Sequence, residues 1–186
     1  MRDLVRCLLM YAVLPLWILS GFLDWWCHKR TAIETTSGWR ESAFHWVMFA
    51  QFGLGSLAAI WLQVNLGLLV LLAGLFALHE FTTWLELRFV TRRREIRPVE
   101  QMVHSFMELL PLAAILLMTV LYDGSGQWVL RFKDEPLPVW HVVAALAAVA
   151  LFNVVPLVEE AWRCAQASRI ERPTRPERFH GGLRQI

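Results

Sequence analysis

Acidic residues and histidines recur at a spacing of four residues in this sequence. Three carboxylates precede a histidine by four positions, and another follows one by the same step: Asp24/His28, Glu41/His45, Glu100/His104 and His104/Glu108. Residues four apart on an α-helix lie on one face about a turn apart, so each pair can direct both side chains at a common point. Converging imidazole and carboxylate groups are typical of transition-metal sites.

A fourth histidine is adjacent to a carboxylate, at His79 and Glu80. Neighbouring residues on a helix point ~100° apart, so both reach one point only at a seam between helices. The other two histidines, His141 and His180, lie away from these pairs and are interpreted as ordinary. Four of the six histidines therefore belong to one predicted layer.

Metal binding explains why so many ionisable groups lie at the ends of apolar segments. An unpaired ionisable side chain at membrane depth is costly, whereas a divalent ion pairs with carboxylates and fixes neutral imidazoles. A tetrahedral zinc needs about four ligands, and about twice that number is present here. Two ions ~3.5–4 Å apart, bridged by carboxylates, would use them. The predicted metal ligands are Asp24, His28, Glu41, His45, His79, Glu80, Glu100, His104 and Glu108.

Long apolar segments position these residues. Of the 186 residues, 56% are hydrophobic and 18% are charged, and the mean hydropathy of +0.43 indicates a membrane environment. Five stretches are long enough to cross ~30 Å of hydrocarbon as helices: residues 4–25, 44–62, 66–87, 99–121 and 138–158. The first lacks a cleavage pattern and is interpreted as a true span. The sequence predicts an all-α, polytopic membrane helix bundle of about five transmembrane helices, four of them forming the ligand-bearing bundle.

The distribution of lysine and arginine predicts an orientation. With five spans, 14 of the 18 Lys and Arg residues fall on the side of the C terminus. Short loops rich in these residues stay in the cytoplasm, so we expect the N terminus outside and the metal layer at the cytoplasmic face. A bacterial inner-membrane protein is expected, with residues 1–168 as the transmembrane bundle and 169–186 as a cytoplasmic basic tail. The net charge of +2 gives no indication of nucleic-acid binding.

An ion-pair network is the main alternative to a metal site. In that interpretation the carboxylates neutralise Arg40, Arg88, Arg97 and protonated histidines, because salt bridges on helices also favour a four-residue spacing. Glu100 can also cap its helix or pair with Arg97. Arginines at a membrane edge can extend to water and need no buried partner, which favours the metal interpretation.

Other residues near the predicted layer are expected to stay outside it. Glu34 lies in a connector and is expected to be solvated, and Glu86 is expected to pair with arginines. Glu159 and Glu160 lie at the matching level of the fifth segment, where they can either close the site or face the surface, and surface exposure is the favoured expectation. Pro156 is expected to kink that segment, because a proline ring displaces a helical hydrogen bond.

The pattern resembles that of the membrane-embedded di-metal proteins as a class. It is similar to the di-iron carboxylate proteins, in which a four-helix bundle presents inward Glu and His residues, and to membrane hydroxylases and desaturases with histidine boxes. The spacing differs from both: Glu-x-x-x-His at Glu41/His45 and Glu100/His104 replaces Glu-x-x-His, and paired histidine motifs are absent. The resemblance implies a class of site and no particular family.

The predicted function follows from this class of site. Mixed imidazole and carboxylate ligands favour iron, with zinc or manganese as alternatives. We expect a di-iron oxidoreductase of the hydroxylase, desaturase or oxidase type, acting on a lipid or other apolar substrate among the membrane lipids, with a cytoplasmic electron donor. Two alternatives stay open. One is a metal-dependent membrane hydrolase with Glu80 as the catalytic base, and the other is a non-catalytic metal-binding or structural subunit.

Overall fold

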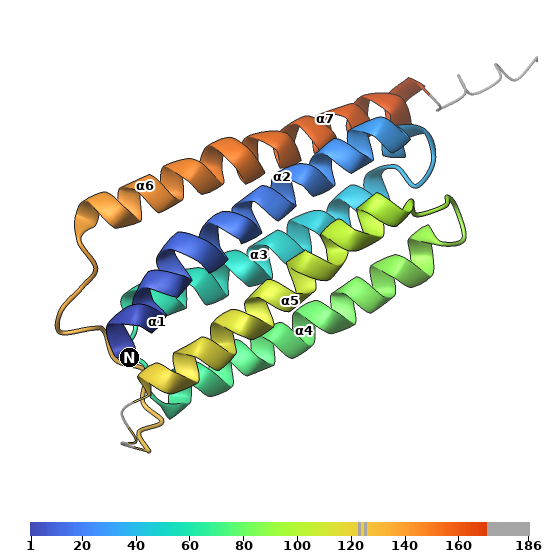
Figure 1. Ribbon diagram of the computed structural model, residues 1–186. Coiled ribbons are helices and arrows are strands. Elements are labelled where there is room, and N and C mark those ends of the chain that lie inside the picture. The colour runs from blue at the N-terminus through green and yellow to red at the C-terminus, as the bar shows by residue number, and fades with distance from the viewer. Residues whose placement is uncertain (123, 125, 171–186) are drawn as a thin grey trace, which may run out of the picture.

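The chain folds into long helices that run side by side (Figure 1). The computed structural model describes residues 1–122, 124 and 126–170, so most of the expected tail at 169–186 lies outside the described residues. The described part contains no β-strand, only an isolated bridge between Leu62 and Phe132. The α-helices are α1 (Arg2–Leu8), α2 (Leu14–Thr31), α3 (Trp39–Trp61), α4 (Leu66–Val90), α5 (Pro98–Leu121), α6 (Val139–Val149) and α7 (Val155–Ile170).

Five segments are long and apolar enough to cross a membrane, which confirms the predicted fold class. Their bounds are Arg2–Thr31, Trp39–Trp61, Leu66–Val90, Pro98–Leu121 and Val139–Ile170. Each extends beyond the apolar stretch that predicted it, because the polar residues at its end continue the helix. His28 and Glu41 lie on helices, as their four-residue spacing from Asp24 and His45 predicts.

Two of the segments contain a π-helical turn. Leu9–Val13 joins α1 to α2, and Ala150–Val154 joins α6 to α7. The second turn directly precedes Pro156, so the irregularity expected at this proline takes the form of a widened turn. A further proline, Pro111, lies inside α5 and removes one hydrogen bond from that helix.

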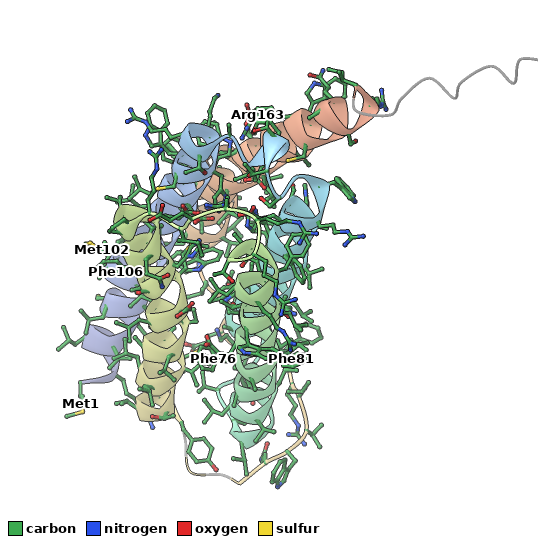
Figure 2. The ribbon with its side chains drawn as sticks, turned by 90° about the vertical axis from the view of Figure 1, so that its right-hand side faces the viewer. Met1, Phe76, Phe81, Met102, Phe106 and Arg163 are labelled. Atoms are coloured by element: carbon green, nitrogen blue, oxygen red, sulfur yellow. The ribbon has the colours of Figure 1, made fainter. Side chains whose placement is uncertain are left out.

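One end of the bundle brings together the termini of all five segments (Figure 1). The C-terminal ends of α2, α4 and α7 meet the N-terminal ends of α3 and α5 there. Helix α3 packs against α4 and α7, and α2 packs against α5 and α7. Figure 2 shows Met1 and Arg163 at opposite ends of the bundle. The fifth segment thus packs on the four that were expected to form the ligand-bearing bundle.

The other end of the bundle is closed by a turn and a loop. Asn65 caps α4 by accepting a hydrogen bond from the Leu68 backbone N–H at 3.0 Å. The loop before α6 returns to this turn, where the Gln63 N–H donates to the Arg131 carbonyl at 2.9 Å. Leu68, Leu72 and Met118 form a small apolar core beside it.

Candidate metal centre

Nine ionisable side chains meet at the end of the bundle where the helix termini converge. We call them the charged cluster: Asp24, His28, Glu41, His45, Glu86, Arg94, Glu100, His104 and Glu160. Seven of them are buried residues, and the side chains of Arg94 and His104 are 5% and 13% exposed. All five membrane segments contribute: α2, α3 and α5 supply two residues each, and α4 and α7 supply one each, Glu86 and Glu160. The connector between α4 and α5 supplies Arg94.

The four-residue spacing produces two levels in the cluster. His28, Glu41 and Glu100 each lie in the terminal turn of their helix, close to the end of the bundle. Their sequence partners lie one turn further in, ~6 Å deeper at 1.5 Å per residue: Asp24, His45 and His104. The pairs predicted from spacing therefore do bring imidazoles and carboxylates together across three helices.

Glu160 joins two of the histidines from the fifth segment. Its carboxylate accepts from Nδ1 of His28 at 3.0 Å and from Nδ1 of His45 at 2.7 Å. The two rings stack with centroids 4.4 Å apart and planes 2° apart. Because both Nδ1 atoms face Glu160, both Nε2 atoms are directed toward the other carboxylates, as in metal sites where a carboxylate orients a ligating histidine.

The Nε2 atom of His28 is buried and makes no hydrogen bond. Oxygen atoms of Glu100, Asp24 and Glu41 lie 3.4, 3.5 and 3.9 Å from it. With the proton of a neutral ring on Nδ1, this nitrogen presents a lone pair to three carboxylates. A cation among these groups would relieve the repulsion and use the lone pair, so the donor set fits a divalent metal.

The other two imidazoles of the cluster have direct carboxylate partners. His45 Nε2 lies 2.8 Å from Glu86, and His104 Nε2 lies 2.8 Å from Asp24. Each contact fits either a hydrogen bond or a pair of atoms that share a metal ion.

Arg94 covers the outer level of the cluster. Its guanidinium donates to both Glu41 and Glu100, and the Ser37 hydroxyl also donates to Glu41. Burial lowers the pKa of Arg94, but its hydrogen bonds to Glu100 and Glu41 outweigh that effect and hold the pKa above its usual range. Arg94 is therefore a permanent cation. The ion-pair alternative assigned this role to Arg40, Arg88 and Arg97, and the described ion pairs contain Arg94 instead.

Three groups within the cluster place possible ligand atoms within 4.8 Å of one another. They are Asp24/His28/His45, His28/Glu100/His104 and Glu41/His45/Glu86. The first two share His28 and the first and third share His45, so the groups form one continuous set. Six of the nine predicted ligands belong to it: Asp24, His28, Glu41, His45, Glu100 and His104.

The other three predicted ligands lie outside these groups. His79 and Glu108 border a cavity that the cluster also borders. Glu80 is partly exposed, lies close enough to Glu108 for the two carboxylates to repel each other, and lines neither of the two cavities beside the cluster. Its buried Oε1 atom makes no hydrogen bond with the described residues.

Two expectations from the sequence are wrong. Glu160 is 1% exposed and contacts two histidines, whereas it was expected on the surface. Glu86 was expected to pair with arginines, yet it contacts His45. Helical spacing offered a signal for both. Glu86 lies two helical turns after His79, a buried residue, and therefore on the same face of α4. Glu160 lies seven residues after Asn153 and four before Cys164, and both of these residues are buried.

The surrounding carboxylates form a separate group. Glu34 pairs with Arg163, so it is held by a partner and not merely solvated. Arg163 also contacts Glu159 at 3.0 Å, and Glu159 accepts from the Trp25 ring N–H at 2.8 Å. These residues tie α7 to α2 next to the charged cluster. Glu100 neither caps α5 nor contacts Arg97 among the described hydrogen bonds.

Two cavities lie on the side of the cluster that faces the interior of the bundle, and the first of them borders the cluster. The first has a volume of about 90 Å³ and is bordered by Asp24, His45, Glu86 and Glu160 on one side and by aromatic and aliphatic side chains on the other. The second, about 100 Å³, lies deeper between α3, α4 and α5 and is mostly apolar. Phe52 and His79 border both.

A scan against protein-family models and searches of curated proteins and of solved structures found no match to this chain. Interpretation of the site therefore rests on its own geometry. The chain has five candidate membrane helices with a buried His/Glu cluster that can hold metal, and no family is identified.

Proposed function

We propose that this protein is an integral membrane metalloprotein that binds two metal ions in the charged cluster and acts as an oxidoreductase on an apolar substrate. The observation that carries the proposal is the buried, unpartnered Nε2 atom of His28, which faces three carboxylates. Buried polar atoms are almost always paired, and a cation bound between this nitrogen and the carboxylates would pair it.

The charge of the cluster supports two ions. Among the described residues it holds five carboxylates and one guanidinium, so neutral histidines leave four negative charges without a partner. Protonation of all three histidines would still leave a net negative charge, and it would place two positive rings in stacked contact at 4.4 Å. Two divalent ions balance the charge without that repulsion.

The ligand set favours iron or manganese. Imidazole and carboxylate ligands suit both metals, whereas a structural zinc site is usually closed by four ligands, often cysteines. No cysteine belongs to the groups of possible ligands in the described chain, and Cys164 is buried behind the cluster. When bound, a pair of irons supplies the electron-transfer chemistry that activates dioxygen.

The residues of the chain would prepare the site for such chemistry. Glu160 holds the rings of His28 and His45 in one orientation, and Arg94 closes the outer level against water. The adjoining cavity is lined by Trp17, Phe49 and other apolar groups, which suits a hydrocarbon substrate and excludes water.

The reaction class is insertion of oxygen into a C–H bond, or its dehydrogenation counterpart. In the first, dioxygen, two electrons and two protons convert a C–H bond into an alcohol and release one water. The electrons come from a donor on the side of the membrane where the cluster lies, which we propose is the cytoplasmic side because the basic connectors lie there.

Iron content and redox response of the purified protein test this proposal. Protein expressed with iron and purified in detergent should contain two irons per chain, with optical and Mössbauer spectra that change on reduction and return with dioxygen. Two zinc ions and no redox response would instead favour hydrolysis. Metals that are bound but inert toward dioxygen, reductant and water would favour a structural subunit, and both outcomes contradict the oxidoreductase.

A further inference from the structure

The two cavities beside the charged cluster share a wall. Phe52 and His79 border both, so the spaces meet between α3 and α4. Along α3 the lining runs from His45 in the first cavity to Ala59 in the second. Fourteen residues separate these positions, which is ~21 Å along the helix axis and about two thirds of the ~30 Å hydrocarbon core of a bilayer.

The polar atoms of this space are concentrated in the first cavity. Asn153 donates from Nδ2 to the Ile18 carbonyl at 3.1 Å, which leaves its buried Oδ1 as an acceptor without a partner. His79 Nδ1, on the other side of the cavity, also has no partner. The second cavity is bordered mainly by apolar groups such as Leu72, Ile115 and Met118, with Gln51 and Ser56 among its polar residues. The buried Oε1 atom of Gln51 also has no hydrogen-bond partner.

An occupant that suits this arrangement is amphiphilic and narrow. Its apolar part would fill the deeper cavity, and its polar end would donate a hydrogen bond to Asn153 beside the cluster. A carboxylate end is disfavoured because the Asn153 oxygen accepts and does not donate. A hydroxyl group can donate and carries no charge.

We propose that these two adjacent cavities together bind a single-chain aliphatic alcohol, or a lipid of the same chemistry, with its tail along α3 and its hydroxyl at Asn153. The inference rests on the proposed function for the reaction that the bound chain undergoes, and it names the substrate class of that site. Binding itself is a property of the cavity and can be measured without turnover.

Gly55 offers a way to fill the deeper cavity. A Cβ atom at Gly55 would lie 3.4 Å from a Leu72 methyl and 3.6 Å from a Leu75 methyl, which is ordinary contact, so a larger side chain enters the cavity. Gly53, two residues earlier in α3, has no atom within 4 Å of the same position and borders neither cavity. Gly53→Leu is therefore a matched control for Gly55→Leu.

The test is photo-crosslinking of the full chain in nanodiscs with a long-chain alcohol that carries a diazirine on its tail. We expect labelled peptides from the deeper cavity, around Ala114 and Ile115, and labelling of Gly55→Leu weaker by roughly tenfold, with Gly53→Leu unchanged. Ala114→Leu serves the same purpose if Gly55→Leu does not accumulate. The carboxylic acid of equal length should label weakly, and Asn153→Leu should abolish the preference for the alcohol.

Equal labelling of wild type and both cavity-filling variants would overturn the inference, as would equal labelling by the acid and the alcohol. Metal content of the same preparations separates this result from the proposed function. Specific labelling of a wild type that binds no metal supports the cavity site and contradicts the metal centre. Metal-loaded protein without specific labelling contradicts the cavity site alone.

Discussion

The histidines at the two ends of the bundle differ in their neighbours. At one end, His28 and His45 are buried among carboxylates from several helices. At the other end, His141 lies 2.9 Å from the Tyr11 hydroxyl and stacks on Trp140. The Nδ1 atom of His141 is also buried without a hydrogen bond, but its neighbours Tyr11 and Trp140 are neutral, and no carboxylate pairs with His141 in the described ion pairs. A histidine in an apolar chain therefore indicates a metal site only when carboxylates from other helices surround it.

The same contrast extends to the way in which each end is held together. The end near Tyr11 is closed by backbone hydrogen bonds and by the apolar core of Leu68, Leu72 and Met118. The cluster end holds five carboxylates and one permanent cation, Arg94, so metal ions would offset the remaining repulsion among the carboxylates. The predictions below separate the two ends.

Removal of Glu160 should have the largest effect. Glu160→Ala leaves the Nδ1 atoms of His28 and His45 without an acceptor, so we expect a loss of about 3–5 kcal/mol in the free energy of unfolding and a loss of bound metal. The control is Glu159→Ala, next in sequence and partly exposed, which should cost about 1 kcal/mol or less. Denaturation in detergent measures both, and equal costs would show that Glu160 does not hold the cluster together.

Removal of Arg94 should have the second-largest effect on stability. Arg94→Ala strips the hydrogen-bonded cation from Glu41 and Glu100, and we expect the metal-free protein to lose about 3 kcal/mol. The loss should be smaller in metal-loaded protein, because bound ions compensate part of the charge. Arg93→Ala, on an exposed neighbour, should change stability by about 0.5 kcal/mol at most. A cost for Arg94→Ala that does not depend on metal would argue against ligands at Glu41 and Glu100.

Metal addition should stabilise one end of the molecule selectively. At a free metal concentration one hundredfold above the dissociation constant, the stability of the wild type should rise by about 2.7 kcal/mol for each ion bound. Thermal melts with and without chelator measure this increase. His28→Ala, which loses at least one ion, should show a smaller increase than wild type, and His141→Ala should show the full increase. An equal response of both variants would remove the distinction between the two ends.

The smallest effect is expected at Tyr11. Tyr11→Phe removes one partly exposed hydrogen bond to His141 and should cost about 1 kcal/mol or less. Metal content should not change. A fall in metal content on this substitution would mean that the two ends are coupled through the bundle.

Much of the fold and the first set of site residues follow from the sequence. Hydropathy indicates the five segments, and the spacing of Asp24/His28, Glu41/His45 and Glu100/His104 indicates which faces meet. These features are local to one helix, so periodicity is sufficient to predict them.

The cluster residues that were not predicted from the sequence are placed there by the rotation of helices against one another and by the path of a connector. Glu159 and Glu160 are adjacent, and only the rotation of α7 after its π-helical turn decides which of them points inward. Arg94 is one of three consecutive arginines, and the conformation of the connector alone selects it. Whether His79 and Glu108 bind an ion or only border the cavity depends on packing that spacing does not determine.

The most direct test of the central claim is the metal content of His28→Ala beside that of His141→Ala and wild type, measured on protein purified in the same detergent. If the charged cluster is a two-metal centre, wild type and His141→Ala each contain two metal ions per chain. His28→Ala, folded by the criterion of its helical circular dichroism, loses at least one of them. Metal-free wild type, or a His28→Ala variant that retains both ions, would contradict the account.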